Sequence, residues 1–180
     1  MGRRERDAEF RRIRLKKLAG KIQELTAKDS DLLQKSLEIL AVRREAAVGL
    51  HRMCAALVND LNPLLPQQEV ILDPLEFSEA DFRDASANWI QINIRGRILR
   101  ISFQATEELT STEDFRVPYC LEGVVRGFHQ QRLEKDLIEE QLLFYTVEKD
   151  QRMWRYFDPR TYRSGPFNEE HLFSLLDQMI

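Results

Sequence analysis

The first sixty residues carry the hydrophobic spacing of a long helix. Apolar side chains recur at intervals of three and four residues between positions 15 and 57, and ten of the thirteen positions in this series are apolar. They are Leu15, Leu18, Ile22, Leu25, Leu32, Ile39, Ala46, Leu50, Met53 and Leu57. No proline occurs between Met1 and Asn62. The pattern predicts helix from about residue 5 to residue 61, as a coiled coil or a helical hairpin.

Three polar residues interrupt the series, at Asp29, Ser36 and Arg43. The stretch 27–31 resembles a helix start, so a break near Asp29 competes with one continuous helix. Beyond it the apolar stripe widens. We therefore favour a continuous helix whose second half packs on the rest of the chain. Pro63 ends it, which predicts a helical arm over 1–62 and a second domain over 63–180.

Polar and apolar residues alternate in the segments 88–94 and 97–103, which predicts two strands of a hairpin. If Arg95-Gly96 is the loop, Ile92 lies opposite Leu99 and Ile90 opposite Ile101, and one face of the hairpin is apolar.

Weaker signals complete the second domain. They predict an edge strand at 69–72, a helical turn from Ser78, a polar loop at 106–116, a strand at 119–128 and a hairpin of 142–147 with 153–158. Gly123 and Gly127 indicate a bulge or a close contact, and 164–166 indicates a turn. Asn168 caps a last helix. The predicted fold is α+β: a long N-terminal helix, an antiparallel sheet of five to six strands and a short C-terminal helix.

Composition excludes several classes of protein. Of the 180 residues, 43% are hydrophobic and 32% are charged, and seven Gly and six Pro are too few for a disordered or fibrous chain. No run of 18 apolar residues and no apolar leader occurs, so we expect a soluble, cytoplasmic protein without a membrane span. Cys54 and Cys120 have apolar neighbours and are predicted to be buried thiols.

Charge is distributed unevenly along the chain. Residues 1–28 contain ten basic and four acidic side chains, a net charge of +6, whereas the whole chain carries −3 and the remainder therefore −9. The centre of this basic arm is Arg11, Arg12, Arg14, Lys16 and Lys17. Such an arm suits nucleic acid or an anionic surface, but the interspersed acids favour the solvated face of a helix.

Catalytic and ligand motifs are absent from the sequence: it has no phosphate loop, nucleophile elbow, zinc motif or calcium loop. We therefore lean against an enzyme and expect no cofactor and no metal. His51 and Cys54, three residues apart, could form half a zinc site, but a core role is commoner. His129 and His171 are expected at the surface.

Aromatic and arginine side chains alternate between residues 154 and 163. The candidate binding residues are Trp154, Arg155, Tyr156, Arg160 and Arg163. This mixture suits a protein partner or stacked bases, although a strand with core aromatics is the commoner explanation.

Three functions are compatible with these patterns. The one we favour is a non-catalytic interaction or scaffold module, which self-associates or pairs with a protein partner through the heptad helix. The second is binding of nucleic acid or an anionic surface by the basic arm, against which the −9 remainder argues. The third is a small-ligand binder or an enzyme of unknown chemistry.

Overall fold

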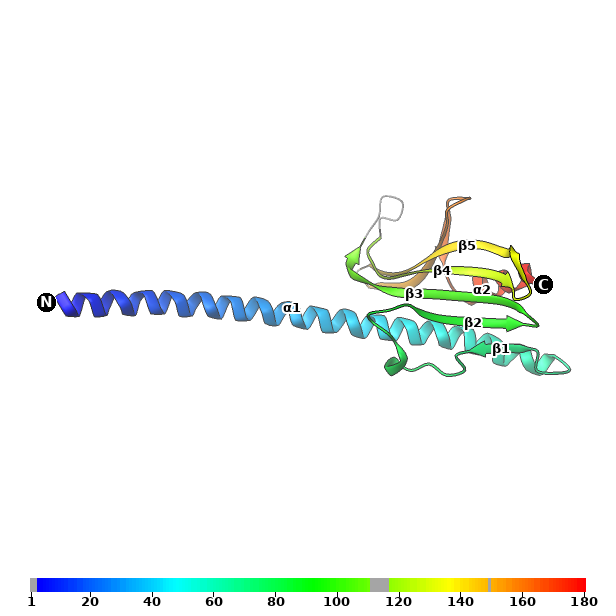
Figure 1. Ribbon diagram of the computed structural model, residues 1–180, viewed down its shortest axis with the longest axis horizontal. Coiled ribbons are helices and arrows are strands. Elements are labelled where there is room, and N and C mark those ends of the chain that lie inside the picture. The colour runs from blue at the N-terminus through cyan, green and yellow to red at the C-terminus, as the bar shows by residue number, and fades with distance from the viewer. Residues whose placement is uncertain (1–2, 111–116, 149) are drawn as a thin grey trace. The chain divides into compact units, whose positions relative to one another are not determined.

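One helix and an antiparallel sheet account for most of the chain. The computed structural model describes the backbone of residues 3–110, 117–148 and 150–180, and the side chains of 9–107, 117–131, 137–148 and 150–180 (Figure 1). Helix α1 spans Arg3–Leu61 and α2 spans Glu169–Met179. The predicted α+β class is confirmed. Contacts divide the chain into two compact units, Met1–Leu40 and Ala41–Ile180, so residues 41–61 of α1 belong with the sheet.

The sheet has seven strands in the order of the sequence, and each neighbouring pair is antiparallel. The strands are β1 (Val70–Asp73), β2 (Asn88–Ile94), β3 (Arg97–Thr110), β4 (Tyr119–His129), β5 (Arg132–Glu148), β6 (Gln151–Asp158) and β7 (Arg163–Pro166). Two residues connect β2 to β3 and β4 to β5, and four connect β6 to β7, as antiparallel neighbours allow; the segment between β1 and β2 is longer.

The β2–β3 hairpin has the predicted register. Ile90 pairs with Ile101 and Ile92 with Leu99, and all four side chains are buried. The loop residues Arg95 and Gly96 have φ angles of 51° and 87°. Positive φ at both central positions is the requirement of a type I′ turn, whose twist matches that of the flanking strands.

Three parts of the sheet differ from the sequence prediction. Strand β3 continues to Thr110, where a loop from residue 106 was predicted; residues 111–116 of that loop lie outside the described residues. Strand β5 begins at Arg132, ten residues before the predicted start. The predicted turn at 164–166 belongs to β7, which raises the strand count to seven. Gly165 and Pro166 are compatible with β7 because it is a short edge strand with one pairing partner.

Helix α1 runs through Asp29 without a break, so the alternative of two helices is wrong. Pro63 lies in the 3₁₀ turn Asn62–Leu64 that follows α1. The Asn62 side chain then accepts a hydrogen bond from the Val70 amide (3.1 Å) and donates one to the Val70 carbonyl (2.9 Å). These two bonds fix the start of β1. A second short turn, Glu79–Asp81, has the predicted cap at Ser78.

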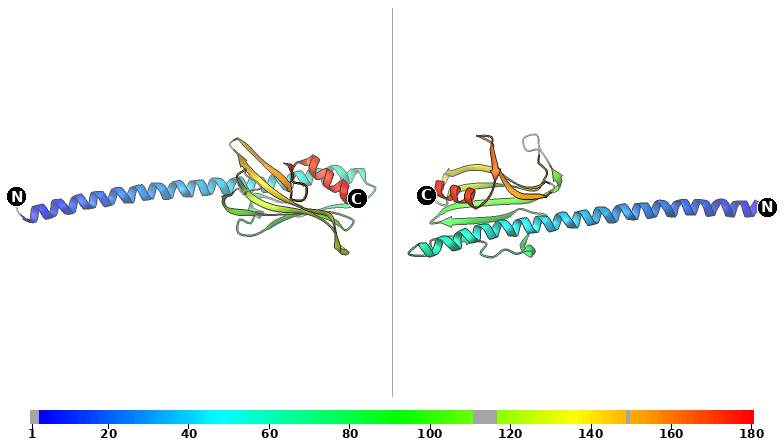
Figure 2. Two further views of the ribbon diagram at one scale, coloured as in Figure 1. Left: turned by 90° about the horizontal axis from the view of Figure 1, so that it is seen from above. Right: turned by 180° about the vertical axis from the view of Figure 1, so that it is seen from behind.

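The core lies between one face of the sheet and two helical segments. Residues 41–61 of α1 and the helix α2 cover the same face (Figure 2). From α1, Ala47, Leu50 and Cys54 are no more than 1% exposed, and from α2, Leu172 and Leu175 are fully buried. The apolar face of β2 and β3 meets them, which accounts for the alternation in those strands.

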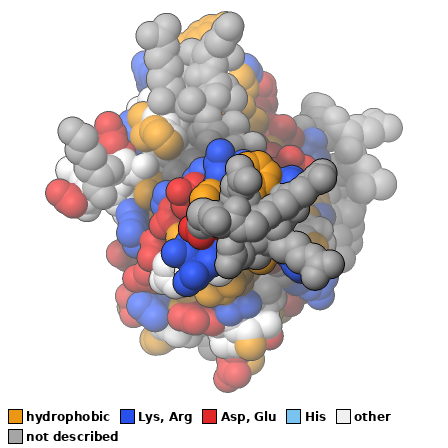
Figure 3. Space-filling view, turned by 90° about the vertical axis from the view of Figure 1, so that its left-hand side faces the viewer, with side chains coloured by type: hydrophobic (Ala, Val, Ile, Leu, Met, Phe, Trp, Pro, Cys, Tyr) orange, Lys and Arg blue, Asp and Glu red, His pale blue; other side chains and the backbone are white. Residues whose placement is uncertain are grey.

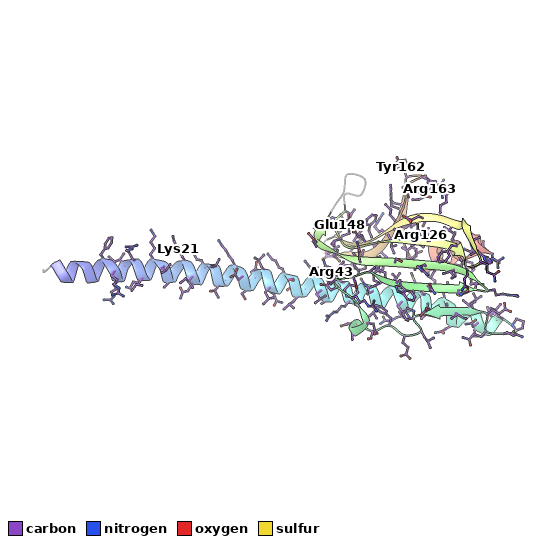
Figure 4. The ribbon with its side chains drawn as sticks, viewed as in Figure 1. Lys21, Arg43, Arg126, Glu148, Tyr162 and Arg163 are labelled. Carbon is purple, nitrogen blue, oxygen red and sulfur yellow. The ribbon has the colours of Figure 1, made fainter. Side chains whose placement is uncertain are left out.

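Arg43 explains one polar interruption of the heptad series. Its side chain is 8% exposed, and it donates hydrogen bonds to the Cys120 carbonyl (3.1 Å) and the Thr106 carbonyl. The β3–β4 register shifts between Ala105 and Thr110, and the β4–β5 register shifts between Tyr119 and Leu121. Thus Arg43 supplies donors where the strand ladders are irregular. An ion pair with Asp84 (3.2 Å) orients the guanidinium. Figure 4 labels Arg43 on α1.

Both cysteines are free and buried, as predicted. Burial raises the pKa of the Cys54 thiol to about 12. Among the helices that the structure describes, none has the length and apolarity to cross a membrane.

Candidate functional site

The N-terminal part of α1 leaves large hydrophobic side chains in water. Between residues 10 and 37, nine such side chains are each at least 53% exposed. They are Phe10, Ile13, Leu15, Leu18, Ile22, Leu25, Leu32, Leu33 and Leu37. Clustered exposure on one short segment is the mark of an interaction surface, because isolated surface hydrophobics are normal but contiguous ones are rare.

Five of these nine side chains follow the heptad series, whereas Phe10, Ile13, Leu33 and Leu37 lie at other positions of the helix. Leu15 and Ile22 occupy position a, and Leu18, Leu25 and Leu32 occupy position d, which places them along one side of the helix. We call the positions 15, 18, 22, 25, 29, 32, 36 and 39 the seam. Six of these eight residues are apolar; Asp29 and Ser36 are the polar members. The seam spans about 37 Å at 1.5 Å per residue.

The heptad series is continuous in the sequence, but its two halves have different surroundings in the structure. From Ala46 onward the apolar members are largely buried in the core, whereas those before Ile39 are exposed. A heptad pattern by itself cannot distinguish a helix face that packs on its own sheet from one that awaits a partner.

The basic arm does not form one patch. Arg11, Arg12, Arg14, Lys16 and Lys17 are all exposed. At about 100° per residue, these five positions point in directions around the whole helix. Figure 3 looks along α1 from its N-terminal end, and hydrophobic (orange) and basic (blue) side chains both appear on the face toward the viewer.

Of the five candidates between residues 154 and 163, Trp154 belongs to the core and Tyr156 is half-buried against α2. Trp154 is 7% exposed, and its indole N–H donates to the Ala46 carbonyl at 3.0 Å. Its ring packs edge-on against Phe103 and Tyr145. Tyr156 is half-buried and stacks on His171, with ring centroids 3.7 Å apart and planes within 7°.

The three arginines are dispersed. Arg155 is half-buried, and its Nε is buried without a hydrogen-bond partner among the described residues. Arg160 pairs with Glu139 and lies 3.7 Å from Asp158, while Arg163 is exposed on the edge strand β7 (Figure 4). The structure therefore does not bring the five candidates onto one surface, and their role in binding stays a prediction.

His171 was expected at the surface, but its side chain is half-buried. Its Nε2 lies 2.9 Å from the Gln141 Oε1. Burial lowers its pKa from the ordinary value of 6.5. The neutral ring is therefore the form that the fold favours.

Protonation of His171 is expected to destabilise the protein in mild acid. Because the folded-state pKa lies below the unfolded one, stability is lost as the pH falls below about 6.5 and through the folded pKa. His171→Phe keeps a stacking ring without the titration. Urea unfolding at about pH 8 and about pH 5 should show a smaller loss in this variant than in the wild type. An equal loss in both proteins would contradict the assignment.

A hollow lies on the sheet face opposite the helices. Its volume is about 510 Å³, and its walls include Tyr119, Leu142, Phe144 and Phe157. Among the described residues of its lining, Glu122 is the one with a charged side chain, and it accepts a hydrogen bond from Gln104 Nε2 at 3.2 Å. The pKa of Tyr119 is raised by burial and, to a smaller extent, by the Glu122 charge. The hollow has a suitable size for a small ligand.

The chain matches no protein-family model, no curated protein and no solved structure. In the part of the chain that the structure describes, no three His, Cys, Asp or Glu side chains are grouped to hold a metal ion. His51 instead contacts the Pro74 carbonyl through Nε2 at 2.8 Å and stacks on Phe77.

Proposed function

We propose that this protein is a non-catalytic interaction module whose N-terminal helix pairs with another helix through the seam. The observation that carries the proposal is the exposure of five large hydrophobic side chains of the seam on one uninterrupted helix. A lone helix in water gains little from hydrogen bonding, and most helical stability in proteins comes from packing an apolar face. A second helix on the seam would supply that packing.

The seam suits knobs-into-holes packing. Leucine fills three of its d positions, Leu18, Leu25 and Leu32, and the series is sustained over more than three heptads. The partner helix is a second copy of the chain or a helix of another protein. Nucleic-acid binding by the arm is less well supported, because its basic side chains surround the helix and acids such as Glu9 and Glu24 lie among them.

The test combines light scattering with a helical probe. Self-association of the full-length chain, prepared without nuclease, is measured by size-exclusion light scattering at 260 and 280 nm. Binding to a dilute fluorescent peptide of about four heptads, with apolar a and d residues and neutral flanks, is measured by anisotropy. We expect the chain to associate with itself, with the probe or with both.

Leu18→Glu with Leu25→Glu should weaken that association at least about 100-fold, because two carboxylates enter an apolar interface. Gln23→Glu with Gln34→Glu adds the same charge outside the seam and should leave the association almost unchanged. A wild-type chain that neither self-associates nor binds the probe would overturn the proposal. Co-purifying material that absorbs at 260 nm and is released by high salt would favour nucleic-acid binding instead.

A further inference from the structure

A row of basic side chains flanks the seam on one side. Arg14, Lys21, Lys28 and Lys35 follow at intervals of seven residues, each immediately before an a position, and all four are exposed. In a helix pair this flank, position g, lies beside the partner. Figure 4 shows Lys21 of this row on α1. We call these four residues the basic flank.

The opposite flank carries no charge. Its members, at position e, are Ala19, Thr26, Leu33 and Leu40. Within the described residues, Arg14, Lys21 and Lys28 have no ion-pair partner, and Lys35 pairs only with Asp31 one turn before it, at 3.0 Å. That pair is 65% exposed on both sides and holds the lysine weakly. The basic flank is therefore available to an acidic partner.

A second copy of the chain is a poor occupant of the seam in either direction. In a parallel pair, Asp29 at position a would face Asp29 of the other copy, and two carboxylates would meet in an apolar interface. In an antiparallel pair, position g faces position g, so the two basic flanks would repel each other. In the parallel pair the basic flank meets only the uncharged e flank. Both homotypic arrangements thus contain an unfavourable charge contact and no compensating attraction.

We propose that the seam takes an acidic amphipathic helix of another protein. Such a helix would place Asp or Glu beside the basic flank and a cationic or amide side chain opposite Asp29. Complementary flanking charges are what selects coiled-coil partners, because they add attraction to the right helix and repulsion to the wrong one. This inference rests on the proposed function, since it specifies the partner of the same seam.

The test compares three probes with one apolar core. Each is a fluorescent peptide of about four heptads, and the e and g positions are all Glu, all Lys or all Gln. Binding to the full-length chain is measured by anisotropy at low and high salt. We expect the acidic probe to bind at least about tenfold more tightly than the basic probe, and the difference to shrink at high salt.

Charge reversal supplies the control. Lys21→Glu with Lys28→Glu should reverse the preference between acidic and basic probes. Lys16→Glu with Lys17→Glu makes the same change in net charge on the outer side of the helix and should preserve it.

The possible outcomes separate the two proposals. Equal binding of the acidic and basic probes would overturn the acidic-partner inference, and so would an equal effect of the two double variants. In either case, binding of the neutral probe would still support helix pairing. Self-association tighter than binding of the acidic probe would also overturn it. If the chain neither self-associates nor binds any of the probes, the proposed function itself fails.

Discussion

Arg43→Met is expected to lower the free energy of unfolding by about 3 kcal/mol. Methionine retains much of the aliphatic stem, so the loss comes chiefly from the hydrogen bonds. The carbonyl of Cys120 loses its donor at 3.1 Å and the carbonyl of Thr106 loses the same guanidinium. Each lost hydrogen bond from the charged guanidinium costs about 1.5–3 kcal/mol, offset in part because the guanidinium no longer has to be desolvated.

Urea unfolding followed by far-UV circular dichroism measures this loss. Arg52→Met is the matched control, because Arg52 lies on the same helix and is exposed. It should change stability by no more than about 0.5 kcal/mol. If both variants have the wild-type midpoint, Arg43 does not support the irregular part of β3 and β4.

Gly123→Ala is expected to be at least as damaging, with a loss of about 3 kcal/mol or more. A methyl group at this position would overlap the carbonyl oxygen of Ser102 and lie 2.9 Å from the Phe103 Cα. Both are backbone atoms of the neighbouring strand β3, so the clash cannot be relieved by a rotamer change. The two strands would have to separate in the middle of the sheet.

Gly49→Ala is the same substitution with the opposite expected sign. A Cβ at Gly49 would meet nothing within 4 Å, and the residue is exposed inside α1. Alanine there should stabilise the protein by up to about 1 kcal/mol. The two denaturation midpoints should therefore move in opposite directions from that of the wild type. A Gly123→Ala protein with unchanged stability would mean that β3 and β4 are farther apart at this point.

The strongest sequence signals predicted the elements most accurately. Ile90 and Ile92 alternate with polar residues because one face of β2 is buried, and that periodicity fixes register as well as strand type. Asn168 was identifiable as a cap because its side chain must satisfy an amide of α2, and it accepts from the His171 N–H at 3.0 Å. In both cases local chemistry and tertiary packing favour the same structure.

The errors arose where tertiary pairing outweighs local preference. Gly165-Pro166 has the composition of a turn, yet it pairs with β6 through Tyr156 and Arg155. Thr106 belongs to a polar segment with the composition of a loop. It nevertheless continues β3, whose earlier residues pair with β2 and β4.

The candidate site was predictable only in part. The heptad series identified the seam, but not that burial begins near Ala46. In the sequence, Arg43 is only a polar interruption of that series, because nothing there reveals the irregular strand pairing near Cys120. Trp154 and Tyr156 had the composition of a binding hot spot, and their contacts with the core appear only in the structure.

Burial of both thiols gives the chain a practical property. Thiolates react with maleimides and methanethiosulfonates, whereas protonated, enclosed thiols do so slowly. Cys54 has a pKa of about 12; burial also raises the pKa of Cys120, although the Arg43 charge lowers it in part. A cysteine introduced on the exposed side of α1, for example at Gln23, would therefore accept a spin label without removal of the native pair. Distances from that label to one on a bound helix would report whether the two run in the same direction.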